Sequence, residues 1–470
     1  MDTAELEESK FMEKEVEDVS VGEVIDIFLH RIKDIEECAS EYIPEAAKRY
    51  NNKTKHLSSK IKDILDELKM QDNNSDRIIS HKKLINTSRN IKRHIGSSPV
   101  ETLEKSLFVS LFSSFDKFIG DLIEVLFRKE PRLYSSINKE IKISEVLKYS
   151  SIQELRQSFL DKEIETIRRK SYQEQFKSLE NQFDIKLTKF KQWSSFIERS
   201  QRRNLFTHCD GIVSKQYIDI CKEVNFEFEK EINIGEQLEV GTEYLFQSCM
   251  VVAQVGIMLG QTLWRKVIST EIDKADSHLN STIYEFLHEE EWSNAIIIGN
   301  FAQSLPNNSS ESIKRMFLIN HAIALNAIDK KGEAKKLLDT RDWSATLLDF
   351  KLAYAVINYD YDEAQKIMIR IGKKGEFVSE LPYHDFPLFR EFRESDQFFD
   401  GYKTVYGYQY LYKVQELAEE TKIEVESLRE ELLVESIFSK TDFFTMQWIP
   451  NASEKQGRLP YFLNTQTQKR

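Results

Sequence analysis

The stretch PVETLEKSLFVSLFSSFDKFIGDLIEVLFRKEP, residues 99–131, decides the fold class of this chain. Its apolar residues recur every three or four positions, which is the spacing of one face of an α-helix. They are Leu103, Leu107, Leu111, Phe115, Phe118, Leu122, Val125 and Leu126. Pro99 suits the first turn of a helix and Pro131 closes the segment. The pattern predicts a long core helix of a helical bundle.

Two further segments predict core helices of the same bundle. The first runs over 186–209, KLTKFKQWSSFIERSQRRNLFTHC, and Gly211 follows it as a C-cap. The second covers about 238–269, where Gly256 and Gly260 lie one turn apart and allow close helix packing, within the bundle or between copies. Its apolar run is interrupted by glutamines and is short for a bilayer, so we expect a buried helix.

The regions on either side of the bundle are also helical in pattern. In the N-terminal region, Pro44 and the polar stretch 51–55 are expected to break one long apolar pattern into a helical pair, and Gly96-Ser97-Ser98-Pro99 marks a boundary. Three segments after residue 278 each combine an apolar helix, a polar turn and a small alanine. These alanines are Ala295, Ala334 and Ala364. The spacing resembles a tetratricopeptide-like array, although further bundle helices would give a similar pattern.

The sequence therefore predicts an all-α protein with four regions. They are an N-terminal helical region with an acidic tail (1–95), a helical bundle (96–270), tetratricopeptide-like helical repeats (271–405) and a C-terminal helix and tail (406–470).

Composition excludes several classes of protein. With 15 Gly and 8 Pro in 470 residues, the chain has too few turn residues for a many-stranded β protein. Four Cys without a CxxC pair exclude a disulfide framework and make a structural zinc site improbable. The net charge of −12 disfavours a general nucleic-acid coat protein but allows a local basic surface. The acidic N-terminus is unlike a signal peptide, so we expect a cytoplasmic protein without a membrane span.

One motif carries chemistry. The stretch 202–213 contains Arg203-Asn204-x-x-x-His208. It resembles the R-x(4–6)-H motif of the HEPN superfamily of helical ribonucleases, and the order of core helices over 99–270 is similar to a HEPN bundle. The resemblance implies a metal-independent endoribonuclease with Arg203, Asn204 and His208 in its site. It also implies a homodimer in which two motifs face each other across a shared cleft.

Spacing alone does not select this motif, because other Arg–His pairs occur. They are Arg49/His56, Arg89/His94 and Arg315/His321, and Arg89-Asn90 even repeats the asparagine. The surroundings favour His208, which ends an aromatic-faced helix, over His94, which lies on a polar stretch.

The residue types suit RNA cleavage by 2′-OH attack. Histidine titrates near neutral pH and moves protons, while the arginine fork binds phosphate oxygens. Asn204 and His208 share a helix face, whereas Arg203 and His208 are about 140° apart on a regular helix. A single motif therefore predicts a poor self-contained pair, in keeping with the dimer.

Charged residues near the motif suggest an RNA-binding strip. The candidates are Lys189, Lys191, Arg199 and Arg202, opposed only by Glu198 between residues 185 and 203. A solvated helix face would show the same pattern. Asp116 and Asp121 lie where the resemblance places a polar residue near the site, although an exposed helix surface accounts for them equally well.

Two functions follow as hypotheses. The first is an endoribonuclease needing no metal or cofactor, acting as a toxin or antiphage effector, with RNA as substrate and a regulatory protein partner on the repeat region. The alternative is a non-catalytic all-α scaffold whose degenerate bundle binds a protein partner.

Overall fold

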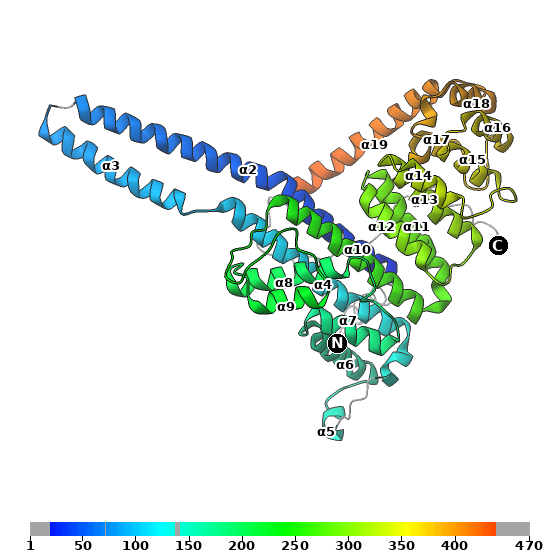
Figure 1. Ribbon diagram of the computed structural model, residues 1–470, viewed down its shortest axis with the longest axis horizontal. Coiled ribbons are helices and arrows are strands. Elements are labelled where there is room, and N and C mark those ends of the chain that lie inside the picture. The colour runs from blue at the N-terminus through cyan, green and yellow to red at the C-terminus, as the bar shows by residue number, and fades with distance from the viewer. Residues whose placement is uncertain (1–18, 71, 137–141, 439–470) are drawn as a thin grey trace. The chain divides into compact units, whose positions relative to one another are not determined.

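The computed structural model describes residues 19–70, 72–136 and 142–438, and its regular elements there are all helices (Figure 1). The one β-type contact among these residues is an isolated bridge between Ile212 and Gln237. The all-α prediction is thus confirmed. The chain divides into two compact units, Met1–Glu271 and Ile272–Arg470, so the N-terminal helices and the bundle share the first unit.

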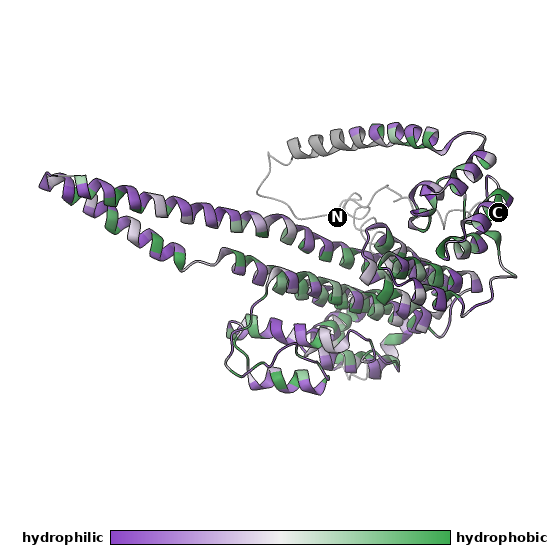
Figure 2. Cartoon of the chain, turned by 45° about the horizontal axis from the view of Figure 1, so that its top comes forward, coloured by the Kyte–Doolittle hydropathy of each residue, from purple (hydrophilic) through white to green (hydrophobic). Residues whose placement is uncertain are grey.

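The core of the first unit is built on α4 (Pro99–Lys129), α8 (Trp193–Cys209) and α10 (Thr242–Val267). Their apolar faces hold large buried side chains such as Phe108, Phe115 and Phe196, and Figure 2 shows green, apolar residues concentrated along these packed helices. α10 is long and apolar enough to cross a membrane by composition alone, but 78% of its most apolar window is buried inside the unit. It is a core helix, as its sequence predicts.

The core helix predicted over 186–209 begins seven residues later than expected, at Trp193. The reason lies in Glu180, whose Oε1 accepts hydrogen bonds from the backbone amides of Leu187 (2.7 Å) and Thr188 (3.0 Å). These amides are satisfied outside a helix, so residues 187–192 form turns before α8 starts.

The predicted break in the N-terminal region is wrong: α2 runs continuously over Val21–Met70 with Pro44 inside it. An internal proline costs a helix about 3 kcal/mol. Packing on both sides of Pro44 offsets this cost, since Ile43 is buried before it and Leu57 and Ile64 are buried after it. The carbonyl that loses its donor belongs to Ser40, which, like Pro44, is exposed.

The two halves of α2 have different neighbours. Before Pro44, Phe28 stacks on Phe118 of α4, with ring centroids 4.3 Å apart. A Cβ on Gly256 of α10 would lie 2.2 Å from the same Phe28 ring, and one on Gly260 would lie 2.8 Å from Ile25. These two glycines therefore admit α2 within the chain, which is the intramolecular role that the sequence left open.

After Pro44, α2 pairs in antiparallel fashion with α3 (Asn74–Ile95), and the predicted boundary at 96–99 separates α3 from α4. The remaining helices of the first unit are short and surround the core. They are η1 (Pro131–Ser136), α5 (Ile143–Val146), α6 (Ile152–Arg168), α7 (Tyr172–Phe183), α9 (Lys215–Glu223) and η2 (Ser269–Glu271).

The second unit repeats one helical hairpin three times. Each hairpin turns at a residue with φ of 61–62°, and a fully buried alanine follows five positions later. The turn residues are Glu290, Asp329 and Tyr359, and the alanines are Ala295, Ala334 and Ala364. The hairpins are α11 (Ile272–His288) with α12 (Trp292–Ser304), α13 (Glu311–Ala327) with α14 (Lys331–Leu338), and α15 (Leu348–Ile357) with α16 (Tyr361–Ile371). The shared turn supports a repeat rather than unrelated bundle helices.

The unit continues after the third hairpin. Its later elements are α17 (Pro382–Asp385), η3 (Pro387–Phe389), η4 (Phe392–Glu394), α18 (Asp396–Tyr406) and α19 (Tyr410–Phe438). The predicted acidic tail and the end of the predicted C-terminal tail lie outside the described residues.

Candidate functional site

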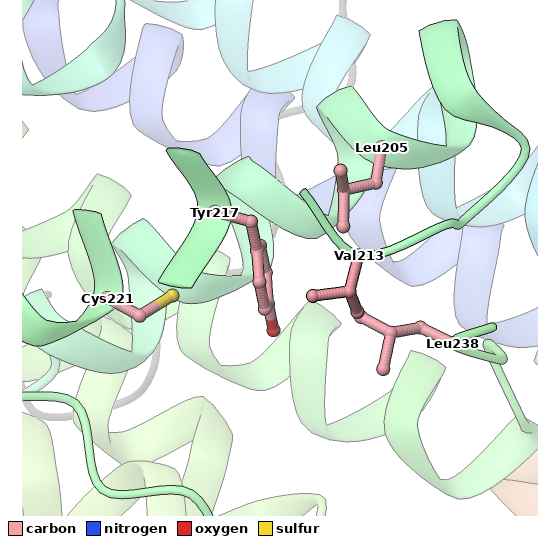
Figure 3. Close-up of a cluster of buried hydrophobic side chains, with 5 residues drawn as sticks. All are labelled: Leu205, Val213, Tyr217, Cys221 and Leu238. Carbon is pink, nitrogen blue, oxygen red and sulfur yellow. The ribbon is translucent and has the colours of Figure 1, made fainter. Parts of the chain in front are cut away.

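The C-terminal end of α8 carries the motif, and a small apolar cluster holds it in place. Leu205 of α8 packs with Val213 of the following loop, Tyr217 and Cys221 of α9, and Leu238 of the segment between α9 and α10 (Figure 3). The helix ends because Asp210 and Gly211 adopt φ of 48° and 82°. A Cβ on Gly211 would lie 2.5 Å from the Phe206 ring, so this position needs glycine for space as well as conformation. His208 is left exposed in the last turn.

All three motif residues line one groove of about 460 Å³ on the first unit. The three residues line it together with other residues of α8, and residues of α4, of the α6–α7 segment and of the start of α9 complete the lining. The groove therefore receives Arg203 and His208 from the same chain, despite their angular separation on the helix. Since both residues line the same groove, their separation on the helix does not by itself require a second copy.

Arg203 is held by two groups from distant parts of the chain. Its Nη2 donates to Tyr172 Oη at 3.1 Å and lies 3.5 Å from Asp116 Oδ2. Tyr172 Oη in turn donates to Asp116 Oδ1 at 2.6 Å. The guanidinium also lies 5.6 Å from the Phe112 ring centroid. Arg203 keeps 22% of its side chain exposed, so it is oriented but still reaches the groove.

Burial governs the acid–base properties of these partners. It raises the pKa of Asp116 above its ordinary value, against the lowering effect of the Tyr172 hydrogen bond and the Arg203 charge. Burial also raises the pKa of Tyr172, and the Asp116 carboxylate adds to this effect. Tyr172 therefore stays a neutral donor, and the pair Asp116–Arg203 is the charged part of the network.

The structure assigns Arg199 and Arg202 to a buried ionic cluster, in contrast to their predicted place on an RNA-binding strip. Glu198 is fully buried and accepts hydrogen bonds from Arg202 Nε (2.8 Å), Tyr217 Oη (2.7 Å) and Tyr244 Oη (2.7 Å). The Arg202 guanidinium lies 4.1 Å from the Tyr244 ring centroid, and Arg199 is 7% exposed. Both arginines are occupied in packing α8 against α9 and α10.

The other predicted site residues are divided between the groove and other surfaces. Asp116 lines the groove, whereas Asp121 pairs with Lys117 (3.0 Å) and Arg31 (3.9 Å) beside a different hollow. Lys189 and Lys191 are exposed in the turns before α8, and neither lines the groove.

His94, the rival candidate, is a packing residue. It is 6% exposed, its ring stacks on Tyr50 with centroids 4.2 Å apart, and its Nε2 lies 2.8 Å from Thr54 Oγ1. These contacts join the end of α3 to α2 and leave the ring no access to a substrate.

Sequence reasoning missed the contribution of the α6–α7 segment to the groove. Arg168, Arg169 and Lys170 at and just after the end of α6, together with Tyr172 and Gln175 of α7, line the same groove as the motif. The run Arg168-Arg169-Lys170 is a visible local signal, but only the fold brings it beside residues more than 30 positions later. The groove thus carries several cations against the single carboxylate of Asp116.

Within the described ranges, no group of three or more His, Cys, Asp and Glu side chains is arranged to hold a metal ion. No family model, curated protein or solved structure matches the chain.

Proposed function

We propose that the chain is an endoribonuclease of the HEPN type that cuts RNA in the Arg203–His208 groove without a metal ion. The observation that carries the proposal is the convergence of Arg203, Asn204 and His208 on one open, cation-lined groove, with Arg203 oriented by Asp116 and Tyr172. A toxin or antiphage role in the cytoplasm is part of the same proposal and rests on the family resemblance.

The residues divide the chemistry between them. His208 is exposed and takes the proton of the attacking 2′-OH or returns one to the leaving 5′ oxygen. Arg203 places its fork against the phosphate oxygens as negative charge grows on phosphorus. Asn204 offers an amide to the same phosphate or to the ribose. The products of this reaction are a 2′,3′-cyclic phosphate and a 5′-hydroxyl.

A homodimer remains part of the proposal, but the argument for it now rests only on the resemblance to the HEPN superfamily. Because one groove already contains an arginine and a histidine, a second copy would add a second set rather than complete a half site. Gly256 and Gly260 do not offer the dimer surface, since α2 covers them.

The test is cleavage of total RNA in the presence of EDTA. The wild-type chain is expected to release fragments with 2′,3′-cyclic phosphate ends, and His208→Ala to lose about 10²–10⁴ in rate. His30→Ala is the matched control, because His30 is an exposed histidine of the same unit away from the groove. Equal activity of the two variants would refute the assignment.

Arg203→Lys tests the role of the fork. If Arg203 binds phosphate in a bidentate manner, the lysine variant is expected to be nearly as inactive as Arg203→Ala, although the charge is kept. Full activity of Arg203→Lys would mean that only diffuse charge is needed.

One observation favours the alternative, a non-catalytic scaffold. Arg203 already has Asp116 and Tyr172 as partners, and a purely structural arginine would have the same contacts. The scaffold predicts no cleavage by the wild-type chain and a loss of stability in Arg203→Ala. In that case the hairpin repeats of the second unit are the place to look for a partner protein.

A further inference from the structure

The second half of α2 and the whole of α3 form a basic arm, defined here as residues 46–70 and 74–95. Residues 46–95 contain 13 Lys and Arg against five Asp and Glu, in a chain whose net charge is −12. The acids are confined to 63–76, at the turn between the helices. The stretches 46–62 and 77–95 each hold six Lys and Arg and no acid. In Figure 2 the ribbons of this helix pair are mostly purple, the colour of hydrophilic residues.

The basic side chains of the arm face solvent. Those exposed are Lys48, Arg49, Lys53, Lys55, Lys60, Lys62, Lys69, Arg77, Lys82, Lys83, Arg89, Lys92 and Arg93. Lys48 and Arg49 share Glu45, and Lys83 lies 3.3 Å from Glu67. Lys53, Lys55 and Lys60 form no ion pair with the described residues. Unlike Arg199 and Arg202, these three lysines are exposed and pair with no carboxylate of the described residues.

Helix geometry arranges the cations in rows. Lys48, Lys55 and Lys62 are seven residues apart, so they lie on one side of α2 at intervals of about 10.5 Å. Lys82 and Arg89 repeat the interval on α3. Buried Leu57, Ile64, Ser80 and Thr87 fill the seam between the helices, and the Thr54–His94 contact fixes their register. The arm is thus a paired, regular support for charge over about 20 Å.

The chemistry of the arm selects its ligand. Tyr50 is the only Phe, Tyr or Trp between 46 and 95, and its ring is stacked on His94, so the arm offers no free Phe, Tyr or Trp ring on which unpaired bases stack. The exposed large apolar residues of the arm are Leu65, Met70, Ile78, Ile79, Ile85 and Ile95. None of them lies in the stretch 46–62, so the basic row of α2 has no apolar face to accompany it into a lipid surface.

We propose that the arm binds the phosphate backbone of a double-helical stem in a folded RNA. Recognition is electrostatic and independent of base sequence, since rows of lysines neutralise phosphates without reading base edges. The choice of a double helix rests on the arm itself. The choice of RNA over DNA rests on the proposed function of the groove, which needs a 2′-OH.

The test measures binding by the full-length chain with His208→Ala, which prevents cleavage. The probes are an RNA stem of about 20 base pairs, a DNA duplex, an unstructured RNA and vesicles with anionic lipid. The arm variant reverses three exposed charges, with Lys53→Glu, Lys55→Glu and Lys60→Glu. Its control reverses three exposed lysines of the second unit, Lys335→Glu, Lys336→Glu and Lys374→Glu, which changes net charge equally.

Salt dependence supplies the magnitude. If about six phosphates are neutralised, affinity for the stem falls roughly 10³-fold between 50 and 200 mM salt, and losing three contacts reduces this to roughly 40-fold. At 100 mM salt the arm variant is expected to bind the stem about 10²-fold more weakly. For the control variant, the affinity for the stem is expected to fall with salt at least as steeply as it does for the parent chain.

Several results would overturn the proposal. They are equal loss in the arm and control variants, tighter binding of the unstructured RNA than of the stem, or binding of vesicles but not of the stem. Circular dichroism establishes that the arm variant keeps its helices, and Lys→Gln at the same positions repeats the test without repulsion. If the stem is bound but the wild-type chain does not cleave RNA, the proposed function is refuted and the assignment of the arm stands. Tighter binding of the DNA duplex than of the RNA stem would refute the choice of RNA.

Discussion

The variant Tyr172→Phe keeps Arg203 but removes the hydroxyl that orients it, so it tests whether activity depends on the orientation of the guanidinium as well as on its presence. The change removes one oxygen that donates to Asp116 at 2.6 Å and accepts from Arg203 at 3.1 Å. It keeps the ring, which lies 5.4–5.8 Å from the rings of Phe112, Phe115 and Phe196. The fold is therefore expected to survive, while the guanidinium loses the hydroxyl that aligns it.

Hydrogen bonds to charged groups contribute about 1.5–3 kcal/mol. If half or more of that is used to hold Arg203 in its productive position, kcat/KM for RNA falls roughly 3- to 150-fold, since 1.4 kcal/mol is one factor of ten. The pKa of Asp116 is expected to rise further, because the Tyr172 hydrogen bond lowers it in the wild-type chain. The loss of activity then grows as pH falls and Asp116 becomes protonated.

The assay is single-turnover cleavage of a labelled RNA at several pH values, with thermal unfolding measured in parallel. Tyr354→Phe is the control, because it removes a similar phenol–carboxylate bond, 3.0 Å from Asp339, in the second unit. Wild-type kinetics for Tyr172→Phe, together with unchanged stability, would refute the idea that Tyr172 orients Arg203. A loss of activity fully matched by unfolding would refute it equally.

Three further outcomes are expected. Gly256→Ala forces a Cβ to 2.2 Å from Phe28 and should cost about 1–3 kcal/mol in urea unfolding, whereas Gly332→Ala has open space and should not destabilise. Burial lowers the pKa of His321 to about 4 from 6.5, so the unfolded state binds more protons between these values; the free energy of unfolding should fall by about 2 kcal/mol from pH 7 to pH 5, and less in His321→Gln. Glu198→Gln strands a buried arginine and should cost about 3–5 kcal/mol, and an unchanged urea midpoint would contradict the buried cluster.

Periodicity predicted the core helices well because burial is what produces it. From Leu111 onward the predicted face of α4 is buried, whereas Leu103 and Leu107 are only partly buried and Phe108 and Phe112 take core positions there. The small alanines of the second unit lie in equivalent positions after equivalent turns. The proline at 44 and the polar stretch 51–55 wrongly predicted a break. The helix continues because burial of the segments on both sides of Pro44 offsets the cost of keeping a proline inside it. Secondary structure here follows tertiary burial whenever the two disagree.

Charge failed as a guide for a related reason. On the sequence, Glu198 is one acid among six bases; in the fold it draws Arg202 and Arg199 inward, together with Tyr217 from α9 and Tyr244 from α10. Those tyrosines lie 19 and 46 residues away, so no local count reveals them. The basic side chains of the arm are not drawn into a buried cluster of this kind, because 46–62 and 77–95 contain no acid to pair with them locally. A charged surface is therefore better predicted by the absence of oppositely charged residues than by an excess of one sign. Arg203 lies between the buried arginines of α8 and the exposed lysines of the arm, since Asp116 orients it while 22% of its side chain stays exposed.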